Sequence, residues 1–123
     1  MNNPAYRIGA ILYGLVVGFF GVNHFLYGAK MTGLIPSYLP GAIVWVYISG
    51  GALVLAAIAI IINVQSKLAG FLLFLLLIII ISVIHIPAFL HAPDEATKMT
   101  FMTSILKDIA MAAAALMAAG KGR

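Results

Sequence analysis

Four ionisable side chains interrupt otherwise apolar stretches of this chain: His24, His85 and the adjacent pair Lys107 and Asp108. Hydrocarbon disfavours such groups, so apolar segments retain them mainly where they face one another or a wet cavity. Imidazole and ammonium groups can donate hydrogen bonds, and a nearby carboxylate sets which form of a histidine is present. These residue types therefore predict a polar pocket that binds a small molecule carrying hydrogen-bond acceptors.

The spacing of these residues along their segments predicts that they can meet. At a rise of about 1.5 Å per residue, His24 and His85 lie about 25 Å and 27 Å beyond the basic residues that precede their segments. Lys107 and Asp108 lie about 12–14 Å inside the last segment, measured from the same outer side. Adjacent side chains diverge by about 100° around a helix. We therefore expect one of this pair to face the core and the other to lie at a seam between helices.

A quinone-like or other amphiphilic small molecule is the ligand that this set favours. Quinone carbonyls accept hydrogen bonds, and the two histidines and the lysine can donate them. Asn23 lies beside one histidine, and Tyr38 lies in the loop that follows. The predicted ligand-binding residues are His24, His85, Lys107, Asp108, Asn23 and Tyr38.

Other uses of the same residues compete with this one. Two histidines on different segments would also suit a b-type haem, which is less favoured because its axial imidazoles must face each other. A metal site is favoured least, because one carboxylate accompanies the histidines and no HxxxH or ExxH spacing occurs, and we expect none. The polar groups could also act only as hydrogen-bonding glue between helices.

The composition excludes a soluble domain. The 123 residues are 64% hydrophobic and 8% charged, with a mean hydropathy of +1.16. A soluble domain of this length could not bury so much apolar surface, so residues 1–123 are expected to form one transmembrane domain with the lipid bilayer as its solvent. The net charge of +4 does not come from basic residues interleaved with aromatic ones, so no nucleic acid is expected as a partner.

The absence of cysteine narrows the chemistry further. It excludes disulfides, thiol redox chemistry, zinc-thiolate sites and iron–sulfur clusters. Neither an activated nucleophile nor a phosphate-binding loop is evident. We therefore expect no autonomous enzyme, and any redox role would require a bound cofactor or a partner subunit.

Four apolar segments predict an all-α fold, an integral membrane four-helix bundle that runs up, down, up and down. The expected spans cover residues 8–27, 42–64, 68–90 and 99–119. The turn at 65–67 is short enough to make its flanking spans antiparallel neighbours. The loop at 29–41 contains two prolines and two glycines, so it should be a poor helix that folds over the mouth of the bundle with Tyr38. Pro87 should kink the third span beside His85, while His91 should lie at the surface.

Basic residues orient the predicted bundle. The end that holds both termini carries more of them: Arg7, Lys67, Lys121 and Arg123. The opposite end carries Lys30 and Lys98. By the positive-inside rule, both termini are expected in the cytoplasm, with the polar groups in the outer part of the membrane.

Small residues indicate where helices pack closely. Gly14, Gly18 and Gly21 repeat along the first span, and further glycine and alanine residues follow in the second and fourth. Such residues let backbones approach one another, so dispersion holds the helices together. Packing within the bundle is favoured, and a homodimer through one such face remains open.

Several short motifs give the chain a family resemblance. They are the stretches 18–25 and 45–50, the pairs Ile35-Pro36 and Leu39-Pro40, the step His85-Ile86-Pro87, and Leu106-Lys107-Asp108. In this order they resemble the DoxX family of small four-span bacterial membrane proteins. The resemblance implies a four-helix bundle in the bacterial cytoplasmic membrane and a subunit of a quinone-linked oxidoreductase assembly. Many relatives carry a glutamate where Leu53 stands here, so chemistry that depends on that glutamate is not expected. A similarity to eukaryotic four-span assembly factors gives the alternative, a non-catalytic scaffold for another membrane protein.

Overall fold

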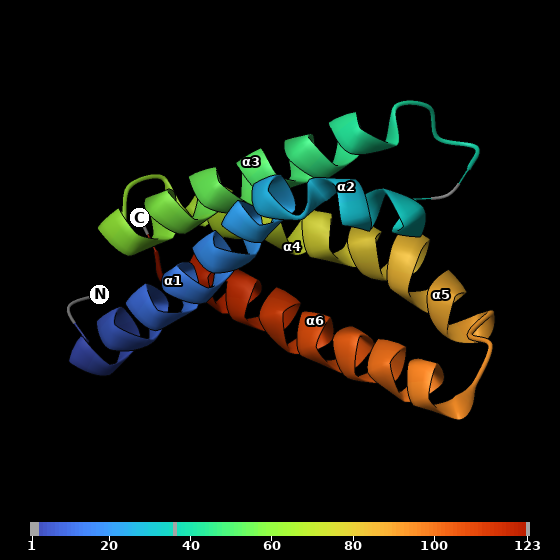
Figure 1. The fold of residues 1–123 in the computed structure, drawn as a ribbon. Helices are drawn as coiled ribbons and strands as arrows, with labels where there is room; N and C mark the ends of the chain where they lie inside the picture. The colour runs from blue at the N-terminus through green and yellow to red at the C-terminus, as the bar shows by residue number, and fades with distance from the viewer. Residues whose placement is uncertain (1–2, 36, 123) are drawn as a thin grey trace.

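The computed structural model describes residues 3–35 and 37–122, and all the regular elements in this part of the chain are helical (Figure 1). Pro36 of the predicted loop and the terminal Arg123 lie outside the described residues. The elements are, in order, α1 (Pro4–Leu26), α2 (Gly28–Met31), the 3-10 turn η1 (Thr32–Leu34), α3 (Ala42–Ile62), α4 (Ser66–Ile80), the π-helical turn η2 (Ile81–His85), α5 (Ile86–Leu90) and α6 (Glu95–Lys121). The predicted all-α class is confirmed.

Four helical stretches in the described residues are long and apolar enough to cross a membrane: Pro4–Leu26, Ala42–Ile62, Ser66–Leu90 and Glu95–Lys121. They correspond one to one with the predicted spans. The first begins four residues earlier than predicted because the side chain of Asn3 accepts a hydrogen bond from the backbone N–H of Ala5, at 2.9 Å, and Pro4 suits the first helical position.

The last helix also begins at a side-chain cap. The carboxylate of Asp94 accepts a hydrogen bond from the backbone N–H of Thr97 at 2.7 Å, and Glu95 supplies an acidic first turn. The cap explains why α6 begins four residues before the predicted span. The acidic residues after Pro93 thus start the helix.

The Asp94 cap makes the start of α6 sensitive to acid. Hydrogen bonds from the backbone and side chain of Thr97 lower the pKa of Asp94. Because the folded state favours the ionised form, its stabilising contribution is complete above the ordinary aspartate pKa of about 3.9. That contribution is lost as the pH falls through the lowered folded pKa. We expect the Thr97 amide resonance to shift in acid with a midpoint below about 3.9, and not to shift in Asp94→Asn. A midpoint at or above the ordinary value would contradict the cap.

The segment after α1 differs from the predicted loop. Gly28–Met31 and Thr32–Leu34 form helical turns, and the hydroxyl of Thr32 donates to the carbonyl of Ala29 at 2.8 Å. The helical turns form because both prolines of the segment come later. Further along, the indole N–H of Trp45 donates to the carbonyl of Pro40 at 2.9 Å and ties the end of the segment to α3.

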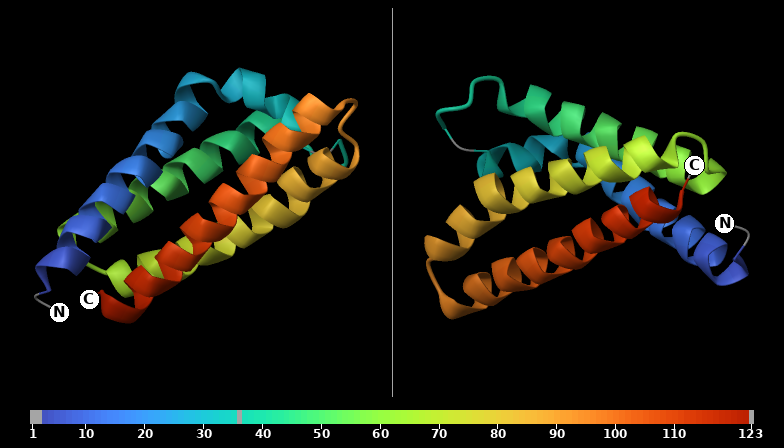
Figure 2. Two further views of the ribbon diagram at one scale, coloured as in Figure 1. Left: turned by 90° about the horizontal axis from the view of Figure 1, so that it is seen from below. Right: turned by 180° about the vertical axis from the view of Figure 1, so that it is seen from behind.

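The four long helices pack as two pairs. α1 lies along α3, α4 lies along α6, and α3 joins the pairs by packing against α4 (Figure 1). Both termini lie at the same end of the molecule (Figure 2). The buried core between the pairs is built from α1, α3, α4 and α6, and its fully buried members include Val17, Ile60, Leu73 and Ala115.

Glycines set the closest approaches within each pair. A Cβ atom on Gly21 of α1 would lie 2.9 Å from the backbone oxygen of Gly50 on α3. A Cβ atom on Gly70 of α4 would lie 2.6 Å from the backbone oxygen of Ala115 on α6. Both distances are shorter than real Cβ contacts, so a larger residue would displace a helix. The small residues therefore pack against each other within the bundle, as the sequence predicted.

Candidate functional site

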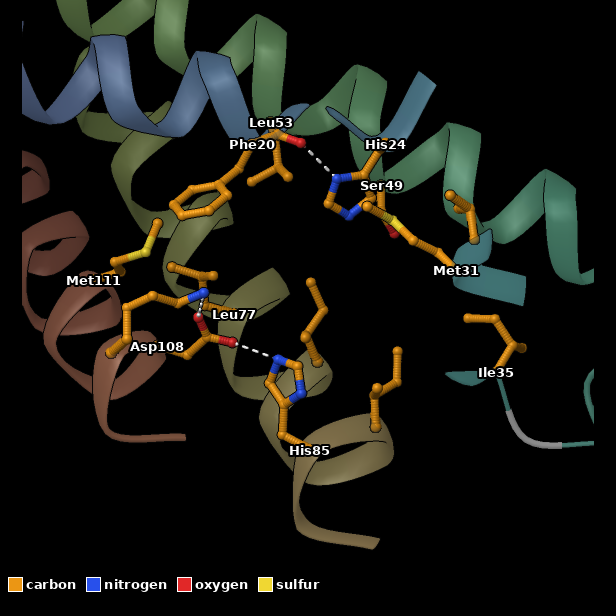
Figure 3. A pocket seen from close by; sticks show the side chains of 14 residues that line it. Phe20, His24, Met31, Ile35, Ser49, Leu53, Leu77, His85, Asp108 and Met111 are labelled. Carbon is orange, nitrogen blue, oxygen red and sulfur yellow. Dashed lines mark hydrogen bonds and ion pairs between the residues drawn. The ribbon is translucent and has the colours of Figure 1, made fainter. Parts of the chain in front are cut away.

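One cavity of about 220 Å³ gathers the ionisable residues predicted from the sequence. Side chains from α1, the segment of α2 and η1, α3, α4 with η2, and α6 surround it (Figure 3). Its lining consists of Phe20, His24, Met31, Ile35, Val46, Ser49, Leu53, Leu77, Ile80, Ile84, His85, Lys107, Asp108 and Met111. Most of these side chains are apolar, so the polar groups form a small part of the wall.

A buried carboxylate organises one side of the cavity. Oδ2 of Asp108 lies 2.9 Å from Nε2 of His85, and its other oxygen lies 3.4 Å from Nζ of Lys107. The Asp108 side chain is 6% exposed, whereas that of Lys107 is 45% exposed. The Lys107 ammonium also lies 4.5 Å from the centre of the Phe20 ring on α1, within range of a cation–π interaction. Asp108 therefore faces the core, and Lys107 lies at the seam between α6 and α1.

A π-helical turn positions His85 on this side. The backbone N–H of Ile86 donates to the carbonyl of Ile81, five residues back, instead of four. Pro87 follows and has no N–H to donate, and its ring would clash with the preceding turn of a regular α-helix. The sequence predicted a kink here. The structure contains a widened turn, an irregularity that is common at functional sites.

His24 lies on the other side of the cavity and bonds within its own helix. Its Nδ1 lies 2.6 Å from the carbonyl oxygen of Phe20, one turn earlier. The second ring nitrogen points into the space beside Ser49 (Figure 3).

The cavity thus brings together four of the six predicted residues. His24 lines the wall opposite the His85–Asp108–Lys107 cluster, and the described residues show no hydrogen bond between the two groups (Figure 3). The predicted convergence of first, third and fourth spans is therefore present as a shared cavity. It is not present as one hydrogen-bonded network.

Tyr38 and Asn23 do not line the cavity. Tyr38 is 75% exposed, so it does not cover the mouth as predicted. Met31 of α2 and Ile35 line the cavity from the same segment, because the helical turns after α1 carry them back toward the bundle. Asn23 precedes His24 on α1, and consecutive helical side chains diverge by about 100°.

Sequence reasoning missed several lining residues that helical spacing could have identified. Phe20 lies four residues before His24, and Met111 lies four residues after Lys107, so each shares a helix face with a predicted residue. Ser49 supplies a hydroxyl within an otherwise apolar stretch of α3. Tyr13 does not line the cavity, but its hydroxyl donates to the carbonyl of Met111 at 2.6 Å and ties α1 to α6 beside it.

Comparison with protein families assigns the chain to a family. A family model described as "Domain of unknown function (DUF8561)" matches residues 13–119. The chain belongs to this family. The matched range of the DUF8561 model contains all 14 residues that line the cavity. No curated protein and no solved structure matched the chain.

Proposed function

We propose that this DUF8561 protein is a four-span membrane protein whose cavity binds a quinone-like or other amphiphilic small molecule. The observation that carries the proposal is the cavity itself, which combines apolar walls with a buried Asp108 carboxylate, two imidazoles and an ammonium. Ligand sites for small molecules have this character, a mostly apolar lining with a few convergent polar groups. If these polar groups only held the helices together, no cavity would be needed beside them.

Insertion in a bilayer is part of the proposal. Large apolar side chains are exposed along every long helix, for example Phe19, Leu55, Leu72 and Met117. Contiguous apolar surface of this extent needs lipid around it. The four spans would run up, down, up and down through the bacterial inner membrane. Both termini would lie in the cytoplasm with the basic residues near them, and the cavity would lie in the outer part of the membrane.

The size and position of the cavity favour an amphiphile. Pockets for drug-sized ligands hold about 300–1,000 Å³, so a cavity of about 220 Å³ suits a ring-sized head group. Lys107 reaches from the cavity to the surface at the seam between α1 and α6. A tail could leave toward the lipid along this seam.

A role as a subunit of a membrane redox assembly completes the proposal. The resemblance to the DoxX family supports it, as does the chemistry of quinones, which carry electrons between membrane proteins. The chain has no cysteine, so electrons would have to come from a partner. Gentle purification followed by mass spectrometry of extracted lipophiles and of retained proteins tests the ligand and the assembly separately.

A matched pair of substitutions on α3 tests binding in the cavity. Ser49 lines the cavity, whereas the neighbouring Ile48 is exposed on the outer surface. We expect a short-chain quinone to raise the melting temperature of the wild-type protein and of Ile48→Phe, because a ligand that binds only the folded state stabilises it. The shift should disappear in Ser49→Phe, whose ring fills the space beside His24. Equal shifts in both variants, or no shift and no extracted amphiphile in the wild type, would contradict the proposed site.

A further inference from the structure

The hydrogen-bond partners of the two histidines fix which ring nitrogen carries the proton. A backbone carbonyl oxygen can only accept, so Nδ1 of His24 must donate to Phe20. A carboxylate also accepts, so Nε2 of His85 donates to Asp108. In a neutral imidazole, a carbonyl or carboxylate partner of this kind sets the tautomer and leaves the other ring nitrogen with a free lone pair.

The cluster around His85 pairs one ammonium with one carboxylate. Lys107 already balances the charge of Asp108, with Nζ and Oδ1 3.4 Å apart. A second cation on His85 would leave a net positive charge on a cluster among apolar side chains, which is costly. The cluster is electrically balanced when the imidazole is neutral.

The two lone pairs are therefore the groups that the histidines offer to a ligand. Nδ1 of His85 is buried and has no hydrogen-bond partner among the described residues. The second nitrogen of His24 points into the cavity from the opposite wall (Figure 3). Both are acceptors when the rings are neutral, and the buried one, Nδ1 of His85, costs about 1–3 kcal/mol while it lacks a donor.

We propose that the cavity selects a head group that donates hydrogen bonds, a hydroquinone or related phenol, over the corresponding quinone. The hydroxyl groups of a hydroquinone would donate to Nε2 of His24 and Nδ1 of His85. Quinone carbonyls are acceptors, so they would leave both nitrogens unpaired. The inference rests on the proposed function, and it reverses the expectation from sequence that the histidines act as donors. A metal ion also takes imidazole lone pairs, but the described residues contain no cluster of three metal-ligating side chains.

Three ligands with the same alkyl tail test the preference. They are the hydroquinone, the quinone and the dimethyl ether of the hydroquinone, which lacks donors, each titrated without oxygen into the protein in lipid nanodiscs. We expect the hydroquinone to bind about tenfold or more tightly than the other two, because only it can donate to the two ring nitrogens, of which Nδ1 of His85 is buried without a donor. His24→Phe should reduce this ratio, and His91→Phe, at an exposed residue outside the cavity, should leave it unchanged.

Nitrogen NMR of the three histidines provides a measurement that needs no variant. In ¹⁵N-histidine-labelled protein, we expect His24 to carry its proton on Nδ1 and His85 on Nε2. The hydroquinone should shift the two unprotonated nitrogens, whereas the dimethyl ether should not. A cationic His85, the opposite tautomers, or equal affinity for quinone and hydroquinone would overturn this inference and leave the proposed function standing. No binding by any of the three ligands would overturn both.

Discussion

Asp108→Ala is expected to lower the free energy of unfolding of the detergent-solubilised protein by about 2–3 kcal/mol, because it removes the acceptor of two donors. The N–H of His85 would lose its 2.9 Å partner in a site where the imidazole is only 16% exposed. The ammonium of Lys107 would lose its counter-charge. Unfolding followed by circular dichroism in a fixed detergent measures the loss.

Two comparison variants separate the contributions of shape and charge. Asp108→Asn keeps an oxygen that can accept from His85, so its loss should be smaller, about 1 kcal/mol. Lys107→Met should also lose less than Asp108→Ala, because the Lys107 side chain is 45% exposed and solvent screens its interaction. If Asp108→Ala were as stable as the wild type while ligand binding disappeared, the carboxylate would serve the ligand and not the fold.

Gly70→Ala is expected to destabilise the protein by about 2 kcal/mol, although alanine favours helices more than glycine does. The added Cβ would lie 2.6 Å from the oxygen of Ala115 and 2.8 Å from the nitrogen of Ala119, which are both backbone atoms of α6. Backbone cannot rotate away as a side chain can, so α4 and α6 must separate. Their separation would also pull His85 from Asp108, because α4 with η2 carries one and α6 carries the other.

Gly9→Ala is the matched control for this change. A Cβ at Gly9 meets no atom within 4 Å, so the same substitution should leave stability unchanged or raise it by up to about 1 kcal/mol. Thermal and SDS-induced unfolding of the two variants, measured in parallel, compare them. Equal stability of Gly70→Ala and the wild type would show that the approach of α4 and α6 is looser than described.

Much of the fold could be predicted because the length of an apolar run directly indicates a helix that can cross a membrane. Each long run of apolar residues became one spanning-length helix, and the Asp94 cap moved the start of the last one four residues ahead of the predicted span. The largest disagreement was the segment after α1. There, two prolines and two glycines predicted a loop at 29–41, but local hydrogen bonds formed helical turns before the prolines were reached.

The candidate site was predicted only in part, because depth along a helix follows from residue counts whereas rotation around it does not. Counting placed His24 and His85 at similar depth, and both line the cavity. It could not show that His24 bonds to the carbonyl of Phe20, nor which of Lys107 and Asp108 faces inward. Those outcomes depend on how the helices are rotated against one another. The exposed position of Tyr38 depends on the path of a segment that has no repeating pattern.

The wide turn at Ile81–His85 has a consequence for the third span as a whole. Its hydrogen bond joins residues five apart, whereas those of an α-helix join residues four apart, so the turn holds one extra residue. The side chains of α5 are therefore rotated by about 100° relative to the pattern of α4. Removing a single residue such as Ser82 would restore a regular α-helix. The residues after the deletion would then face a different direction around the helix axis. The alignment of this span with its neighbours is therefore encoded by the number of residues before Pro87 as well as by their chemistry.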